Sequence, residues 1–283
     1  MASILDRIFS AKREELAGQF ERVPLHTIVT AAQNAPLPRD FVAALRHHRP
    51  AIIAEIKRAS PSKGDILPGL DPIAVAREYQ SVGAAAISVL TDRHFKGSLE
   101  DLTAIRGAVD LPILRKDFLF DPYQVYESRA AGADCILLIA AMLEPAQLNT
   151  LMQLADDLGL ASLVEVHNQE EMSSVVELDA RLIGINNRDL HTFRTDLATT
   201  TELLRDHQGS ALIVSESGIE TADHIQQLYK DGARAFLIGE SLLRGATPGL
   251  ALAALANCFN QTSADTSHNQ SSSEKAPTRS SEG

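Results

Sequence analysis

The sequence alternates short apolar runs with longer amphipathic stretches, and this alternation limits the folds open to the chain. Each run is rich in β-branched residues, as expected of strands that are covered on both faces of a parallel sheet. Strand–helix units repeated in this way predict an α/β protein, here a single (β/α)8 TIM barrel with extra N-terminal helices. The eight runs begin at Ala51, Ala85, Leu111, Asp134, Ala161, Arg181, Ala211 and Arg234.

The residues between the runs support the same periodicity. A glycine stands shortly before three of the runs, where it can end a helix in the left-handed conformation, and a proline stands at three expected helix starts. A doubly wound open sheet is the main alternative, but no glycine-rich dinucleotide-binding motif follows the first run. The glycines are Gly83, Gly132 and Gly232, and the prolines are Pro72, Pro122 and Pro145.

The chain divides into three segments. We expect residues 1–50 to form a helical extension packed on the barrel, either capping its bottom or bordering the mouth of its active site. Residues 51–261 would form the catalytic barrel. Residues 262–283 are rich in Ser and Thr and have no apolar periodicity, so they cannot offset the entropy of ordering and are predicted to be a disordered tail.

Charge and cysteine content exclude several kinds of partner. The formal net charge of -11 disfavours nucleic acid and anionic membranes, so an anionic substrate would have to be held by local cations and backbone amides. The two cysteines, Cys135 and Cys258, lack metal-ligand spacing and suit a reducing compartment. The N-terminus resembles an amphipathic helix and neither a signal peptide nor a membrane span. We therefore expect a cytoplasmic protein, either a monomer or a weak homo-oligomer.

Polar residues occur at the carboxyl ends of strands that should otherwise be apolar. An ionisable group buried in a parallel barrel is costly unless it is paired or functional, and this end of the barrel is where such enzymes build their sites. The charges could simply neutralise one another, but two lysines and three glutamates on one face favour proton-transfer chemistry. The residues are Glu55, Lys57, Lys116, Glu165, Asn186, Glu216 and Ser217.

Three loops after expected strands are suited to phosphate. Residues 217–220 and 239–242 place glycine and small polar residues just before helices, where free N–H groups and the helix dipole attract an anion. The loop after the first run adds Ser60 and Ser62. One such glycine could serve only a tight turn, but three loops in barrel register favour a phosphate-bearing small molecule as the ligand.

No metal or cofactor is indicated by the sequence. The histidines show no helix-based metal motif, and no cysteine cluster lies near them. Arg188 and Phe118 follow catalytic-looking strand ends, where each could be either a loop anchor or a substrate contact.

Six motifs taken together resemble the indole-3-glycerol-phosphate synthase family, from the N-terminus to about Leu243. They are EIKRASPSKG, LRKDF, LVEV, GINNRDL, SESGI and LIGESL, in that order and each at a strand end. The resemblance implies a cofactor-free enzyme of tryptophan biosynthesis, a carboxy-lyase. It would cyclise the phosphosugar 1-(2-carboxyphenylamino)-1-deoxyribulose 5-phosphate to indole-3-glycerol phosphate, with loss of CO2 and water.

The same resemblance implies residue roles. Lys116 would be the general acid that protonates the substrate carbonyl, and Lys57 and Glu165 would serve the dehydration. Glu55 and Glu216 would orient and tune the lysines. The remaining expected contacts are Asn186, Arg188 and Ser217 to substrate hydroxyls or carboxylate, Phe118 to the aromatic ring, and Ser60, Gly218, Gly239 and Glu240 to phosphate, the last through its backbone N–H.

Other readings remain open at this point. Phosphoribosylanthranilate isomerase and the tryptophan synthase α subunit are phosphosugar barrels with similar phosphate loops, but neither places two lysines on the first and third strands. A non-catalytic phosphate-binding barrel that serves as a scaffold is a different class of protein, because fold and phosphate loops do not establish chemistry. Five charges facing the mouth argue against a scaffold.

Overall fold

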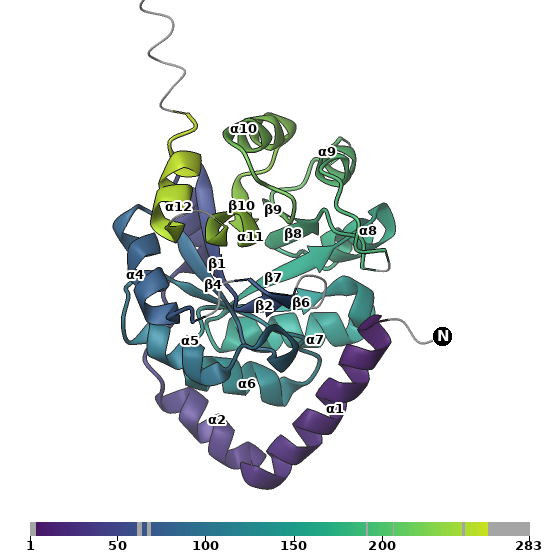
Figure 1. The fold of residues 1–283 in the computed structure, drawn as a ribbon. Coiled ribbons are helices and arrows are strands. Elements are labelled where there is room, and N and C mark those ends of the chain that lie inside the picture. The colour runs from purple at the N-terminus through teal and green to yellow at the C-terminus, as the bar shows by residue number, and fades with distance from the viewer. Residues whose placement is uncertain are drawn as a thin grey trace, which may run out of the picture.

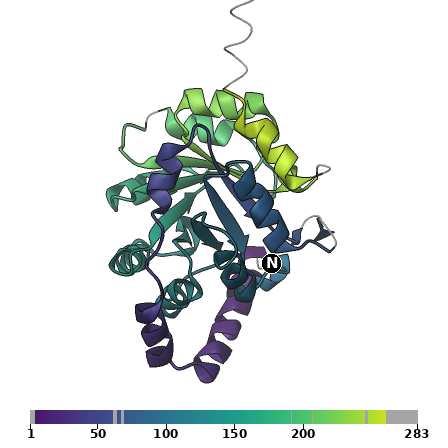
Figure 2. The same ribbon diagram turned by 90° about the vertical axis from the view of Figure 1, so that its left-hand side faces the viewer.

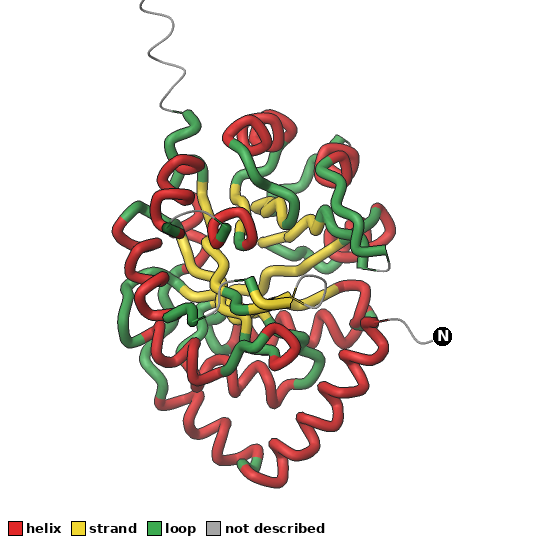
Figure 3. The backbone as a smooth tube through the Cα atoms, in the orientation of Figure 1, coloured by secondary structure: helices red, strands yellow, loops and turns green. Residues whose placement is uncertain are grey.

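The computed structural model describes residues 4–60, 64–66, 69–190, 192–205, 207–244 and 247–259. Within these residues eight parallel strands close into a barrel, in the order β1-β10-β9-β8-β7-β6-β5-β4, and helices surround it (Figures 1 and 3). The (β/α)8 prediction is therefore confirmed. The barrel strands are β1 (Ala51–Ile56), β4 (Ala86–Leu90), β5 (Ile113–Lys116), β6 (Cys135–Ile139), β7 (Ala161–Val166), β8 (Leu182–Asn186), β9 (Leu212–Glu216) and β10 (Ala235–Ile238).

The helices begin and end largely where the sequence predicts. Asp71 and Asp121 accept hydrogen bonds from backbone N–H groups one turn into the helices that start at Pro72 and Pro122. Gly132 and Gly232 follow helix ends with φ of 91° and 125°. The outer helices are α4 (Pro72–Ser81), α5 (Leu99–Arg106), α6 (Pro122–Ala131), α7 (Pro145–Asp157), α8 (Gln169–Glu177), α9 (Ala198–Leu204), α10 (Ala222–Asp231) and α12 (Pro248–Ala256).

Shorter elements lie in the loops around the barrel. The small hairpin of β2 and β3 follows β1, and a single turn of helix, α11, directly follows β10. They are β2 (Ala59–Ser60), β3 (Gly64–Asp65), η1 (Arg93–Phe95), η2 (Ala140–Met142) and α11 (Glu240–Leu243).

The N-terminal helices contact the barrel at both of its ends. The helices α1 (Ile4–Arg22) and α2 (Leu25–Asn34) form a V-shaped pair at one edge of the barrel (Figures 1 and 2). Through α1 the extension reaches the mouth, where Ile8 lines the central cavity. Through α3 (Phe41–His47) it closes the bottom, because Phe41 and Leu45 pack into the apolar interior of the barrel.

The strands alternate between two hydrophobic clusters, and this alternation positions the site. In β1, Ile52 and Ala54 face the helices, whereas Ala51 and Ile53 face the barrel interior. Because successive strand side chains point to opposite faces, the next inward residue is Glu55. The same parity makes Lys116, Glu165, Asn186 and Glu216 the inward residues at the ends of β5, β7, β8 and β9.

Several predictions lie beyond what the structure tests. The tail 262–283 and Ser62 lie outside the described residues, and only the backbone of Ser60 is described. The division into a 1–50 extension, a 51–261 barrel and a tail stays a prediction. No helix in the described part of the chain is long and apolar enough to cross a bilayer.

Candidate active site

The inward polar side chains meet in a cavity of about 290 Å³ at the carboxyl end of the barrel. Both lysines and all three glutamates predicted from the sequence line it. So do Asn186, Phe118, Arg188, Ser217, Gly218, Gly239 and Glu240. The side chain of Ser60, the remaining predicted site residue, lies outside the described part of the structure.

Lys116 stands between two carboxylates. Its Nζ lies 3.0 Å from Oε2 of Glu165 and 3.3 Å from Oε2 of Glu216. Burial by itself would lower the pKa of this amine, but the carboxylates of Glu165, Glu216 and Glu55 outweigh burial and raise it. Lys116 is therefore an ammonium group at neutral pH, and it can donate a proton to a bound molecule.

The second lysine belongs to a separate ion pair. Nζ of Lys57 lies 2.7 Å from Oε1 of Glu55, and both side chains are largely buried. Burial would raise the pKa of Glu55, but Lys57 and Lys116 hold it below its usual range. Each lysine of the site is therefore paired with a buried glutamate, Lys57 with Glu55 and Lys116 with Glu165.

Two glycines make room for the glutamates. A Cβ atom at Gly184 would lie 2.1 Å from Oε1 of Glu216, and one at Gly239 would lie 2.4 Å from Oε1 of Glu55. Heavy atoms cannot approach so closely, so each glutamate occupies space that a larger side chain on the neighbouring strand would fill. These glycines therefore have a packing role, and Gly239 combines it with its place at the predicted phosphate loop.

The predicted phosphate loops contain two consecutive residues with positive φ and the start of a short helix. Ser217 and Gly218 both have positive φ, 67° and 79°, directly after β9, and for serine this conformation is uncommon. Gly239 caps the short helix α11 without a side-chain hydrogen bond. The carboxylate of Glu240 pairs with Arg244 and lies 3.8 Å from Arg188, so neighbouring guanidinium groups compensate its charge.

An apolar wall completes the cavity, and sequence reasoning found only Phe118 of it. The loop between β8 and α9 folds back on itself through a bridge between Arg188 and Thr195. This loop contributes Leu190 and Phe193 to the cavity wall. Nothing in the periodicity marks these loop residues. The apolar lining residues missed outside the strands include Ile8, Phe95, Leu190 and Phe193.

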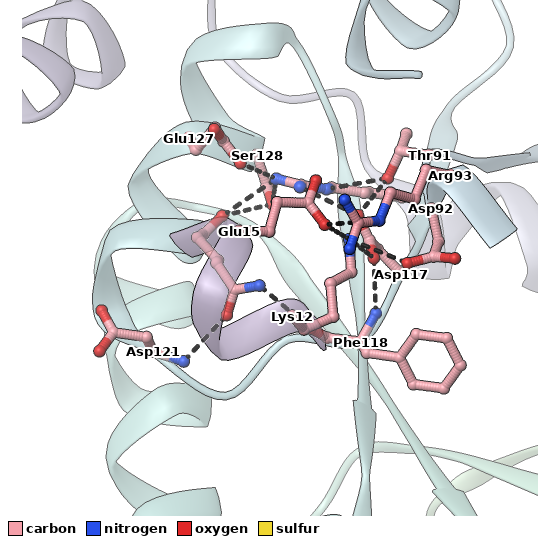
Figure 4. Close-up of polar contacts among 12 residues, drawn as sticks. Lys12, Glu15, Thr91, Asp92, Arg93, Asp117, Phe118, Asp121, Glu127 and Ser128 are labelled. Carbon is pink, nitrogen blue, oxygen red and sulfur yellow. Dashed lines mark hydrogen bonds and ion pairs between the residues drawn. The ribbon is translucent and has the colours of Figure 1, made fainter. Parts of the chain in front are cut away.

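A buried polar cluster holds α1 against the site, and sequence reasoning missed this cluster too. Lys12 reaches from α1 to Asp92 after β4 and to Asp117 after β5, at 3.0 and 2.8 Å (Figure 4). Asp117 also accepts from Arg115 and Thr91 and forms the helix-facing side of the β5 end. These contacts hold Asp117, the residue directly after Lys116, in place.

Among the described residues, no group of three or more His, Cys, Asp and Glu side chains is placed to hold a metal ion. The residues of the site can donate protons from ammonium groups, accept protons at carboxylates and bind anions through backbone amides.

Comparisons with known proteins agree with this geometry. Residues 5–255 match the sequence profile of the family described as indole-3-glycerol phosphate synthase. A protein of that name from Roseiflexus castenholzii is 51% identical over 253 residues, covering 86% of this chain and 94% of that protein. The one from Chromobacterium violaceum is 47% identical over 260 residues, covering 90% and 98%.

Solved structures with distant sequences share the fold. A 3-hexulose-6-phosphate synthase from Salmonella typhimurium superposes with a TM-score of 0.62 at 12% identity, covering 75% of this chain and 99% of that one. The tryptophan synthase α subunit from Legionella pneumophila gives a TM-score of 0.58 at 15% identity, covering 78% and 98%. At these identities the likeness concerns the barrel alone.

Proposed function

The chain belongs to the indole-3-glycerol phosphate synthase family, and on that premise we propose how its residues act as an enzyme of tryptophan biosynthesis. The substrate is 1-(2-carboxyphenylamino)-1-deoxyribulose 5-phosphate, and the enzyme is a carboxy-lyase that closes the pyrrole ring. The observation that carries this proposal is an ammonium group, Lys116, held between two buried carboxylates 3.0 and 3.3 Å away, beside a second lysine.

In the first step, the ring carbon that bears the carboxylate attacks the ketone carbon of the sugar chain. Lys116 gives its proton to the ketone oxygen, so that a hydroxyl forms in place of an alkoxide. The positive charge of the ammonium group stabilises the oxygen as negative charge develops on it. The carboxylate then leaves as CO2, and its bonding electrons restore the aromatic ring.

Dehydration follows in the same cavity. Lys57 gives a proton to the new hydroxyl, which departs as water, and Glu165 accepts the proton lost from the adjacent ring carbon. Across both steps the enzyme donates two protons to the substrate and accepts one from it. The net gain of one proton balances the negative charge of the carboxylate, which leaves as neutral CO2. The second cation at Lys57 also suits the substrate carboxylate before it leaves.

The remaining residues bind and orient the substrate. We assign the phosphate to the backbone N–H groups of Gly218, Gly239 and Glu240, together with Ser60. Asn186, Arg188 and Ser217 would hold hydroxyl or carboxylate groups, and Phe118 would contact the aromatic ring. Glu55 and Glu216 would orient the lysines. A cytoplasmic location and a monomeric or weakly associated state stay predictions.

Product fluorescence tests the assignment directly. The chain has no tryptophan, so the indole product is detected with little protein background. We expect turnover by the wild-type protein, its abolition in Lys116→Met, and a smaller or step-specific loss in Lys57→Met. The exposed Lys230 on α10 provides the matched control, Lys230→Met.

Three other outcomes would contradict the proposed function or the role of Lys116. Substrate binding without turnover by the folded wild-type protein would favour the scaffold reading. Neither binding nor turnover would favour another phosphosugar barrel enzyme. Full activity of Lys116→Met would remove Lys116 from the role of general acid and leave the family assignment standing.

A further inference from the structure

The two carboxylates beside Lys116 do not have equal surroundings. Glu165 accepts a hydrogen bond from Lys116 at 3.0 Å through Oε2 and one from Nδ2 of Asn186 at 3.1 Å through Oε1. Glu216 makes a longer contact to Lys116, at 3.3 Å. Its Oε1 atom is buried and has no hydrogen-bond partner among the described residues. Glu165 is therefore the better stabilised anion of the two.

A histidine outside the predicted site adds to this difference. Nε2 of His167 lies 3.4 Å from Oε1 of Glu165, and Nδ1 lies 3.1 Å from Oε2 of Glu171. The imidazole is only 11% exposed. Burial would lower its pKa, but the carboxylates on its two sides raise the pKa of His167 to about 10. His167 is therefore an imidazolium at neutral pH.

The local sequence places this histidine by two independent devices. Along β7, Leu163 and Glu165 face the barrel interior, and His167 is the next residue of the same parity. Asn168 then caps α8 by accepting from the N–H of Glu171 at 2.9 Å. Glu171 in turn accepts from the backbone N–H of His167 at 2.7 Å, so the helix cap aims a carboxylate at the imidazole.

The other face of His167 borders a second, polar cavity of about 250 Å³. The charged groups lining that cavity are Asp189, Arg194 and Asp196, from the loop between β8 and α9. Together with Lys116, Glu165, Glu171 and Glu216, these are the titratable and charged groups that face the imidazole or its carboxylate partner.

We propose that His167 is a positioning residue for Glu165, and that its positive charge keeps Glu165 ionised while a proton shared by the two barrel carboxylates resides on Glu216. This proposal rests on the proposed function, in which Glu165 must accept a proton. Two carboxylates close together share a proton, and a neighbouring cation decides which of them holds it. His167 lies beside Glu165 and not beside Glu216.

Burial and the neighbouring Glu165 raise the pKa of Glu216 to about 8 in spite of Lys116, in agreement with this arrangement. Glu216 is then neutral at pH 7, and Glu165 is free to act as the base. Without His167 the proton would spend part of its time on Glu165, and that fraction of the enzyme could not complete dehydration.

The pH dependence of kcat in His167→Gln tests the proposal. We expect a loss of about tenfold at pH 7, the effect of removing one nearby cation. The loss should disappear as the pH rises through about 8, because both carboxylates then ionise. A loss of the same size at every pH would mean that His167 only supports the structure, and would overturn the proposal. The control is His48→Gln, at an exposed site after α3.

A second measurement, an NMR titration of the carboxyl groups, does not require the protein to turn over substrate. In protein carrying ¹³C at the glutamate carboxyl carbons, Glu165→Gln and Glu216→Gln assign the two resonances by their absence. In the wild-type protein we expect the ¹³C chemical shift of the Glu216 carboxyl carbon to titrate near pH 8. The Glu165 carboxyl carbon should keep the chemical shift of an ionised carboxylate. In His167→Gln the Glu165 resonance should titrate as well.

The outcomes separate the two proposals. A wild-type protein without turnover contradicts the proposed function, yet the carboxyl titration still decides where the proton resides. Titration of Glu165 in place of Glu216 in the wild-type protein overturns the inference, even if the enzyme is active. If His167→Gln fails to fold, the wild-type titration still decides which carboxylate holds the proton.

Discussion

The amino group of Lys12 lies 2.8 Å from Oδ1 of Asp117, the residue that directly follows Lys116 (Figure 4). Lys12 also pairs with Asp92 at 3.0 Å, so one side chain of α1 joins the loops after β4 and β5. Burial would raise the pKa of Asp117, but Arg115 and Lys12 lower it to about 2. The N-terminal helix is thus attached to the active-site end of the barrel by buried charge.

Replacing Lys12 with methionine should destabilise the protein and reduce its activity. The change leaves two buried carboxylates without their shared cation, and removing one partner of a buried ion pair costs about 3 kcal/mol. Urea unfolding measures this loss, and kcat reports the displacement of Lys116. The control is Lys230→Met, at an exposed position on α10. Equal stability of the two variants would show that the ion pairs of Lys12 contribute nothing.

Replacing Gly184 with alanine should reduce activity strongly. A Cβ atom there would lie 2.1 Å from Oε1 of Glu216, so the carboxylate must move away from Lys116. A displacement of about 1 Å at a catalytic group can cost about 100-fold in rate, and overpacking should lower stability by roughly 1–3 kcal/mol. Steady-state kinetics and urea unfolding measure the two effects.

Gly107→Ala is the matched control, because a Cβ atom at Gly107 would meet its nearest neighbour at an ordinary 3.7 Å. If Gly184→Ala kept both the rate and the stability of this control, the position of the Glu216 carboxylate would not depend on the absence of a side chain at residue 184.

The buried Glu216 should make stability fall as the pH rises. Its pKa of about 8 in the folded protein exceeds the ordinary 4.5, so the folded state binds the proton more tightly. The resulting stabilisation is complete below 4.5 and is lost as the pH rises through 8. Between these values the free energy of unfolding should fall more steeply in the wild-type protein than in Glu216→Gln, by at most about 1.4 kcal/mol per pH unit.

Urea unfolding at several pH values measures the two slopes. Glu177→Gln, at an exposed position on α8, should keep the wild-type slope. Parallel curves for wild type and Glu216→Gln would mean that Glu216 is ionised throughout, against the proton assignment made above.

Much of the fold followed from local rules. Strand periodicity, helix-start prolines such as Pro122 and terminating glycines such as Gly132 are properties of adjacent residues, and the closed barrel satisfies all of them together. The predicted site residues lie together for a related reason. Parallel strands of a barrel bring their carboxyl ends to one face, so polar residues at strand ends, such as Lys116 and Glu216, had to converge.

The sequence by itself therefore determined the barrel, the end at which its site lies, and the lysines and glutamates that line it. Only the tertiary structure decided which partners each charge has. Lys12 and His167 showed no local pattern of function, because their roles depend on contacts with Asp117 and Glu165. The pKa of a buried group reflects every charge around it in space, and spacing along the chain does not record those neighbours.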